Sequence, residues 1–202
     1  MLSSIADIRM GATLRGLDAT RPVPLGNYEL VRIGDVSQDG VLLSKSFPRI
    51  SPKQPVSEQL FLRSGDILFP NRGTRTTAVV YRRDAGPTIA GAQFFILRPK
   101  LEDLLPEYLA WYLRTEKAAA HFEGRRKGSY VQILERRDVA ELQVPVPPLI
   151  QQQKIVAIVA LALSERKLTE RLLALRWKLV NQQLSECAKS LTNRINPTDA
   201  ER

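Results

Sequence analysis

Gln143-Val-Pro-Val-Pro-Pro148 and the roughly forty residues after it, which contain neither glycine nor proline, decide the fold of this chain. The stretch from Leu149 to about Leu191 is rich in Leu, Ala, Gln, Lys, Arg and Glu, a composition typical of one long helix. At about 1.5 Å per residue such a helix would be on the order of 60 Å long, much longer than the diameter of a small domain. The sequence therefore predicts a long helix over 148–191, followed by a flexible polar tail over 192–202.

Apolar residues in this helix recur at steps of three and four, which places them on adjoining faces. The first series is predicted to form a dimer interface: Ile158, Leu161, Leu168, Leu172, Leu175 and Leu179. A second series consists of Leu173, Trp177, Val180, Leu184, Cys187 and Leu191. A helix this long cannot bury so wide a band against a small domain, so we expect it to pair with another chain. The alternative is an amphipathic helix folded back on its own domain.

Composition restricts the class of protein. The 202 residues are 44% hydrophobic, enough for one packed domain with an appendage. No apolar run is long enough to span a membrane, and the N-terminus lacks a secretory signal. A single cysteine, Cys187, excludes an internal disulfide framework and a multi-cysteine zinc site. We therefore expect a cytoplasmic protein without a membrane partner.

The charge balance points to a polyanionic partner. Thirty Lys and Arg residues against twenty-one Asp and Glu residues give a formal net charge of +9. Nucleic acid is the polyanion most often bound by basic cytosolic proteins, although basic proteins without such a ligand exist.

Residues 1–147 have the pattern of a small α+β domain. Short strands are predicted at 28–33, 66–69, 77–82, 87–90, 93–97 and 141–146. One helix is predicted from Pro106 to near Gly124, because proline is favoured in the first helical turn. The expected fold is thus a small mixed, mostly antiparallel sheet domain followed by one long C-terminal coiled-coil helix.

The sequence is poor in catalytic residues. The single histidine, His121, lies among alanines late in the predicted helix, where a structural role is the simpler interpretation. Metal-ligand spacings and phosphate-binding glycine loops are absent from the sequence, so we expect no bound metal or cofactor. Glu165-Arg-Lys167 resembles part of a nuclease motif, but it lies within the long helix without a partner strand. A small nuclease remains an alternative, and purified protein that cleaves DNA with metal would establish it.

Two polar loops are better candidates for function, because arginine, asparagine and glutamine side chains can read base edges in the DNA major groove. The first loop contains Asn71, Arg72, Thr74, Arg75 and Thr76. The second contains Arg125, Arg126, Lys127, Ser129, Tyr130 and Gln132. Solvated surface is the simpler explanation for either loop alone. Two such loops in one basic domain favour double-stranded DNA as the ligand.

The order of short motifs is similar to that of the specificity subunits of type I restriction-modification enzymes. The motifs are Ile8-Arg-Met-Gly11, Leu30-Val-Arg-Ile-Gly-Asp-Val36, Gly65-Asp-Ile-Leu-Phe-Pro-Asn-Arg-Gly73, Leu105-Pro-Glu-Tyr-Leu-Ala-Trp-Tyr-Leu113, Gly128-Ser-Tyr-Val-Gln132 and Pro147-Pro-Leu-Ile-Gln-Gln-Gln-Lys-Ile155. Each motif alone is weak. Their order, followed by the long helix, is specific, and the resemblance covers nearly the whole chain.

This resemblance implies a non-catalytic target recognition domain over 1–147 that positions a methyltransferase subunit and, in addition, a restriction subunit. S-adenosylmethionine, ATP and Mg²⁺ would then be bound only by those partner subunits. The chain departs from the family in two ways. A glutamine, Gln151 or Gln152, replaces the glutamate of the last motif, and only one recognition domain and one long helix are present.

A half-length subunit would have to pair with its own copy. An antiparallel homodimer would present two identical domains to an inverted-repeat site, with one half-site per chain and half-site centres at most roughly two DNA turns apart. One alternative is an assembly or regulatory half-subunit that exchanges into a full complex without reading DNA. Another is a fragment of a longer subunit. Selection from random DNA separates the first alternative from recognition.

Overall fold

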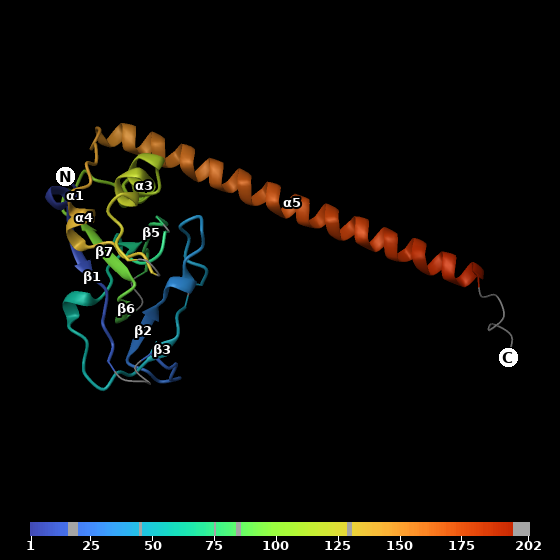
Figure 1. Cartoon of the computed structure of the whole chain (residues 1–202), viewed down its shortest axis with the longest axis horizontal. Helices are drawn as coiled ribbons and strands as arrows, with labels where there is room; N and C mark the ends of the chain where they lie inside the picture. The colour runs from blue at the N-terminus through green and yellow to red at the C-terminus, as the bar shows by residue number, and fades with distance from the viewer. Residues whose placement is uncertain (16–19, 45, 75, 84–85, 129–130, 196–202) are drawn as a thin grey trace. The chain divides into compact units, whose positions relative to one another are not determined.

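The run Phe94-Phe-Ile-Leu97 lies in the middle of the larger sheet of the computed structural model (Figure 1). The structure describes all residues except 16–19, 45, 75, 84–85, 129–130 and 196–202, with the backbone alone over 190–195. Neighbouring strands of the larger sheet are antiparallel, in the order β1 (Ala6–Met10), β7 (Phe94–Pro99), β4 (Ile67–Pro70) and β5 (Val79–Val80).

Strand β7 is apolar without alternation because both of its faces are buried. Phe95 and Leu97 belong to one hydrophobic cluster, and Phe94 and Ile96 belong to another on the opposite face. A continuous apolar run is the pattern expected of such a strand. Each fully buried phenylalanine or leucine side chain contributes about 1.5–3 kcal/mol through removal of its surface from water.

The smaller sheet contains β3 (Arg49–Ile50), β2 (Tyr28–Val31) and β6 (Thr88–Ala90), in that order. Strand β2 is antiparallel to β3 and parallel to β6. The short 3-10 turns η1 (Ile33–Asp35) and η2 (Glu58–Leu60) lie in the connections. The sequence predicted one mostly antiparallel sheet. In the described residues the strands instead form two sheets, since the chain passes from one sheet to the other between β6 and β7.

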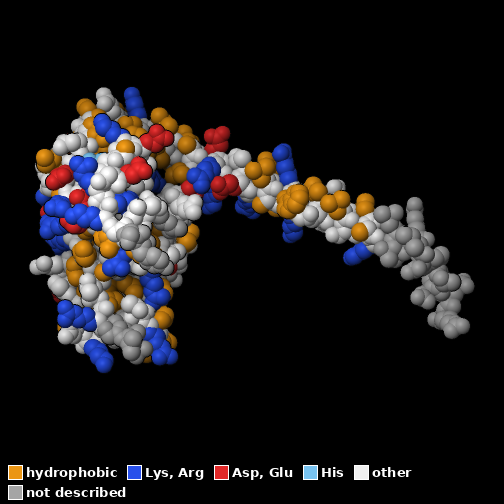
Figure 2. Space-filling model, in the orientation of Figure 1, with side chains coloured by type: hydrophobic (Ala, Val, Ile, Leu, Met, Phe, Trp, Pro, Cys, Tyr) orange, Lys and Arg blue, Asp and Glu red, His pale blue; other side chains and the backbone are white. Residues whose placement is uncertain are grey.

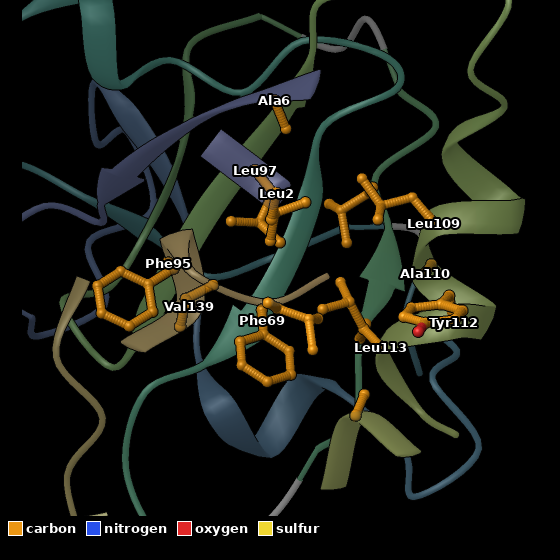
Figure 3. Packing of buried hydrophobic residues seen from close by; sticks show 14 of the residues in the cluster. Leu2, Ala6, Phe69, Phe95, Leu97, Leu109, Ala110, Tyr112, Leu113 and Val139 are labelled. Carbon is orange, nitrogen blue, oxygen red and sulfur yellow. The ribbon is translucent and has the colours of Figure 1, made fainter. Parts of the chain in front are cut away.

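Short helices cover one face of the larger sheet. They are α1 (Leu2–Ile5), α2 (Pro106–Leu113), α3 (Glu116–Glu123) and α4 (Arg136–Ala140). Figure 3 shows side chains from these helices, including Leu2, Leu109 and Val139, packed with Phe69 and Phe95 of the sheet. This cluster is the principal core of the domain.

The predicted helix from Pro106 to Gly124 is divided at Thr115. The Thr115 hydroxyl accepts a hydrogen bond from the Ala118 amide at 3.4 Å, so this residue caps a new helix, α3. A threonine that caps a helix start interrupts the helix before it, which the apolar periodicity alone did not show.

The predicted strand over 141–146 is wrong. The structure assigns no strand to this segment, and tyrosine hydroxyls of α2 bind its carbonyl groups instead. The Tyr108 hydroxyl donates to the carbonyl of Pro145 at 2.8 Å, and the Tyr112 hydroxyl donates to that of Gln143 at 2.9 Å. Burial raises the pKa of Tyr108, which keeps its hydroxyl a donor. Proline lacks the amide donor that a ladder needs, so side chains take the place of a neighbouring strand.

Asp66 of the Gly65-Asp-Ile-Leu68 motif has a structural role. Its carboxylate accepts hydrogen bonds from the Nε and Nη2 of Arg98, both at 2.7 Å, and from the Arg63 amide at 2.8 Å. Only 1% of Asp66 is exposed, so it is a buried and fully paired charge at the start of β4. The hydrogen bonds that Arg98 donates to Asp66 raise the pKa of Arg98 despite the opposing effect of burial.

The long helix α5 (Leu149–Ile195) confirms the expected architecture of a small α+β domain and one long C-terminal helix. Its first two turns belong to the same compact unit as the sheets, Met1–Ala157. There Ile155 and Val156 pack against the principal core. Residues 192–195 of the predicted tail continue the helix, and the rest of that tail lies outside the described residues.

Gln152 attaches the first turn of α5 to the domain. Its side-chain oxygen accepts from the Leu105 amide at 2.9 Å, and its side-chain nitrogen donates to the carbonyl groups of Asp103 and Pro147, both at 2.8 Å. The residue is completely buried. Gln151, by contrast, is exposed. Of the two glutamines at the position of the family motif, Gln152 therefore has a structural role that a carboxylate would not fill.

The second compact unit, Ile158–Arg202, consists of the remainder of α5. Most of its large apolar side chains up to residue 189 are exposed in the single chain, with exposed fractions of 71% for Leu161 and 67% for Leu168. No helix in the described part of the chain is both long and apolar enough to cross a membrane.

Candidate nucleic-acid interface

The two polar loops that the sequence singled out lie side by side. The Gly73 amide donates to the carbonyl of Gln132 at 2.8 Å, and the Leu134 amide donates to the carbonyl of Asn71 at 2.9 Å. Ile133 and Lys127 exchange two backbone hydrogen bonds, at 2.8 and 3.0 Å. Segment 71–73, segment 132–134 and residue 127 therefore form a short ladder that continues beyond the end of β4, and the two loops present one surface.

Asn71, which was predicted to contact DNA, is buried beneath this surface. The residue is only 3% exposed, and its side-chain nitrogen donates to the carbonyl of Ala92 at 2.8 Å. Its position directly after β4 explains the burial, because every residue of that strand is buried. The sequence did not show which end of the loop is covered.

The exposed side chains of the ladder are Arg72, Lys127, Gln132 and Ile133; in the rest of the first loop, Thr74 is exposed and Thr76 is half-buried. The Arg72 side chain makes no polar interaction with any described residue. All five guanidinium N–H groups of Arg72 are therefore available to an acceptor, whether a base edge or a phosphate.

The cations of the second loop divide into supporting and outward-facing groups. Arg126 is half-buried and donates to the carbonyl of Gly73, so it ties the second loop to the first. Burial lowers the pKa of Arg126. Arg125 donates to the carbonyl of His121 at 2.9 Å and lies 3.9 Å from a carboxylate oxygen of Glu141. These two arginines therefore brace the loop.

Lys127 remains a surface charge. Its ammonium lies 2.7 Å from a carboxylate oxygen of Glu135, and that hydrogen bond is the main reason that the pKa of Glu135 is lowered. Solvent screens an exposed pair of this kind, so an approaching phosphate can compete with Glu135 for Lys127.

Gly128 sets the shape of the second loop. Its φ of +106° is a conformation that other residues avoid, and a Cβ on this residue would lie 2.5 Å from the carbonyl oxygen of Val131. The glycine of the Gly128-Ser-Tyr-Val-Gln132 motif is therefore required by backbone geometry. Arg75, Ser129 and Tyr130, which were also predicted to bind DNA, lie outside the described residues.

A third segment, which the sequence did not single out, adjoins the two loops. It is the turn Gly91-Ala92-Gln93 between β6 and β7, closed by a hydrogen bond of 3.0 Å from the Phe94 amide to the carbonyl of Gly91. The Asn71 amide donates to the carbonyl of Gln93 at 2.9 Å, which places the turn beside the first loop. A Gly-Ala-Gln turn between two apolar strands was the one available signal in the sequence.

Two features of the described residues bear on chemistry outside these loops. The Nε2 of His121 lies 2.8 Å from the carbonyl oxygen of Asp138, which agrees with a structural role. No group of three or more His, Cys, Asp or Glu residues in the described part of the chain is arranged to hold a metal ion. Figure 2 shows Lys and Arg side chains spread over the visible face of the sheet domain, with fewer acidic ones among them.

The sequence and the fold are similar to those of known proteins. The family model described as "Type I restriction modification DNA specificity domain" matches residues 2–174. The fold is similar to the HsdS subunit from Thermoanaerobacter tengcongensis, with a TM-score of 0.62 and 20% identity over 100% of this chain and 50% of that one. No curated protein sequence matches the chain significantly.

Two further structures share the fold. One is a chain from a study of complex assembly and conformational transition in a type I R-M system, with a TM-score of 0.61, 21% identity, and coverage of 84% of this chain and 39% of that one. The other is the S subunit of a type I restriction-modification system from M. genitalium, with a TM-score of 0.51, 15% identity, and coverage of 79% and 37%. The chain thus spans half or less of the length of each of these proteins.

Proposed function

The chain belongs to the family of type I restriction-modification DNA specificity domains, and we propose that it recognises one half-site of a DNA target through the ladder of residues 71–73, 127 and 132–134. Family membership makes it a DNA sequence-recognition subunit without catalytic activity of its own. The observation that supports the site most strongly is that two loops, distant in sequence, are joined by backbone hydrogen bonds into one surface with exposed cationic and amide groups.

The chemistry of the exposed groups suits a duplex. The planar guanidinium of Arg72 can bridge the two major-groove acceptors of guanine, and the amide of Gln132 can pair with adenine. Lys127 is placed to neutralise a phosphate. The bracing by Arg125 and Arg126 holds these groups in fixed positions, which reduces the entropy lost on binding.

We propose a homodimer formed through α5. The apolar side chains of Ile158, Leu161, Leu168, Leu172, Leu175 and Leu179 are 47–71% exposed in the single chain. Unpaired leucines along a helix of 47 residues favour association with a second helix. Two-fold symmetry with antiparallel helices would place identical recognition domains on an inverted-repeat site. A helix roughly 70 Å long limits half-site centres to about two DNA turns apart.

The proposed partners follow from the family. A methyltransferase subunit that uses S-adenosylmethionine would bind the dimer and modify the recognised site. A restriction subunit that uses ATP and Mg²⁺ would be a further partner. The chain itself would contribute position and sequence choice.

Selection from a pool of random duplexes tests this function. The purified protein is expected to enrich an inverted repeat with a fixed spacer, and its mass in solution is expected to be that of two copies. Enrichment of no sequence would instead favour the alternative, an assembly or regulatory half-subunit that exchanges into a complex. The exposed apolar band of α5 is compatible with that alternative as well.

Arg72→Ala is expected to weaken binding to the selected site by about 1–3 kcal/mol if the guanidinium reads a base. The substitution removes an exposed side chain without described partners, so the free energy of unfolding should change by less than about 0.5 kcal/mol. Fluorescence anisotropy with the selected duplex and with single-base variants measures the effect.

Arg171→Ala on α5 is the control for the loss of one positive charge, because Arg171 is exposed outside the candidate interface. A loss for Arg72→Ala that is equal on all sequences would identify a phosphate contact. Affinity equal to that of the Arg171→Ala protein would remove Arg72 from the interface.

A further inference from the structure

We propose that Gln93, in the turn between β6 and β7, reads a base pair of the half-site that the two polar loops contact. This inference rests on the proposed function, since it assigns an additional specificity-determining residue to the same DNA interface. The side chain of Gln93 is exposed and makes no polar interaction with any described residue. Its amide is therefore free to donate and accept at a base edge.

The turn that carries Gln93 is held from several sides. The Gly91 amide donates to the carbonyl of Val31 at 3.0 Å, and the Ala12 amide donates to the carbonyl of Ala90 at 2.7 Å. The buried side chain of Asn71 binds the carbonyl of Ala92 from the other side. A residue presented on so constrained a turn loses little backbone freedom when it binds a ligand.

Gly11 shows how closely the chain packs behind this turn. A Cβ on Gly11 would lie only 2.3 Å from the carbonyl oxygen of Gly91 and 2.7 Å from that of Ala90. The glycine of the Ile8-Arg-Met-Gly11 motif is thus required because two backbones meet without space for a side chain. This contact fixes the position of the turn relative to the larger sheet.

The hydrogen-bonded register places Gln93 opposite Asn71, the residue before Arg72. Pro70 is paired with Phe94 in the antiparallel register of β4 and β7, and the hydrogen bond from Asn71 to Gln93 continues that pairing by one position. Neighbouring strands are about 4.8 Å apart, and successive base pairs are about 3.4 Å apart along the DNA axis. Side chains from adjacent segments of the ladder can therefore reach base pairs one or two steps apart.

The cleft next to Gln93 favours a base edge over a phosphate. Gln93, Thr13, Arg32 and Asp35 line a cavity of about 710 Å³. The lining contains one cation, Arg32, and one carboxylate, Asp35, and that carboxylate accepts from the backbone amide of Arg32 at 2.7 Å. The buried Nε of Arg32 has no hydrogen-bond partner in the described part of the chain. A cleft with donors and acceptors but no excess of positive charge matches the edge of a base, and the glutamine amide matches adenine.

A binding experiment on the full protein tests this assignment. The site selected by the wild-type protein is altered one base pair at a time, and the affinity of each duplex is measured for the wild type, Gln93→Ala and Gln38→Ala. At the base pair that Gln93 contacts, the wild type is expected to bind the selected duplex roughly tenfold or more tightly than a duplex with another base pair there. Gln93→Ala should lose that preference at this position alone, and Gln38→Ala, which changes an exposed glutamine in another turn, should retain it.

Each other result overturns the assignment. Unchanged preferences in Gln93→Ala would show that the residue does not read a base, and an equal loss on every duplex would show a contact with the DNA backbone. Sequence-independent binding by the wild type would overturn the proposed function itself. Retained preference in the wild type with no effect of Gln93→Ala would overturn only the inference about Gln93.

Discussion

Replacing Leu172 and Leu175 together with aspartate is expected to convert the proposed homodimer into a single-copy particle. The two side chains are 47% and 55% exposed in the single chain and lie within the first apolar series of α5. Burial of a leucine contributes about 1.5–3 kcal/mol, and a two-fold interface contains each leucine twice. Their loss should therefore raise the dissociation constant of the dimer at least a thousandfold. Sedimentation equilibrium across a range of concentrations measures this change.

Asn181→Asp combined with Ser185→Asp is the matched control. These substitutions add the same charge on the polar side of α5, where both residues are exposed. The control protein should remain a dimer, and circular dichroism should show that both variants are folded. Dimers for both variants would contradict the assigned interface, and a wild-type protein of single-copy mass would contradict the homodimer altogether.

Gln152→Glu is expected to lower the free energy of unfolding of the recognition domain by about 3–5 kcal/mol. The amide nitrogen of Gln152 donates to two carbonyl groups, and the residue is completely buried. A carboxylate in its place would lose both donors and would bring a negative charge against the carbonyl oxygens of Asp103 and Pro147. Urea denaturation followed by tyrosine and tryptophan fluorescence measures the difference.

Gln151→Glu provides a neighbouring control with the same chemical change. Gln151 is exposed in the first turn of α5, where a negative charge interacts favourably with the helix dipole. The free energy of unfolding of the Gln151→Glu protein should be unchanged or raised by less than about 1 kcal/mol. Equal stability of the two variants would show that the buried hydrogen bonds of Gln152 do not hold the helix start.

Local patterns predicted the elements whose environment is uniform along the chain. The apolar run at 94–97 predicted a strand, and the long stretch without glycine or proline predicted α5, because strong periodicity and composition act over many residues. Thr115 and the segment 141–146 were misread because their structure depends on single side chains. A capping hydroxyl divides one helix, and two tyrosine hydroxyls replace the expected strand neighbour.

The candidate site was predictable only in part, for a related reason. The sequence identified two polar loops, but their connection depends on hydrogen bonds between residues far apart in the chain, such as Gly73 and Gln132. It also treated Asn71 and Arg72 alike, although one is buried and the other exposed. The sequence did not indicate Gln93, because a single glutamine in a short turn has no distinctive pattern. Its position opposite Asn71 follows from strand register, which the local sequence did not specify.

The hydrogen bonds of Gln152 also determine where recognition domains of this kind can be exchanged between proteins. A chimaera joined at Pro148 would retain Asp103 and Leu105 but would take the side chain that satisfies them from the other parent. A junction after Ala157 would transfer the recognition domain together with the first turns of α5, which pack against it. Recombination that produces new target specificities should therefore succeed more often when it falls downstream of these turns than when it falls in the proline-rich connection.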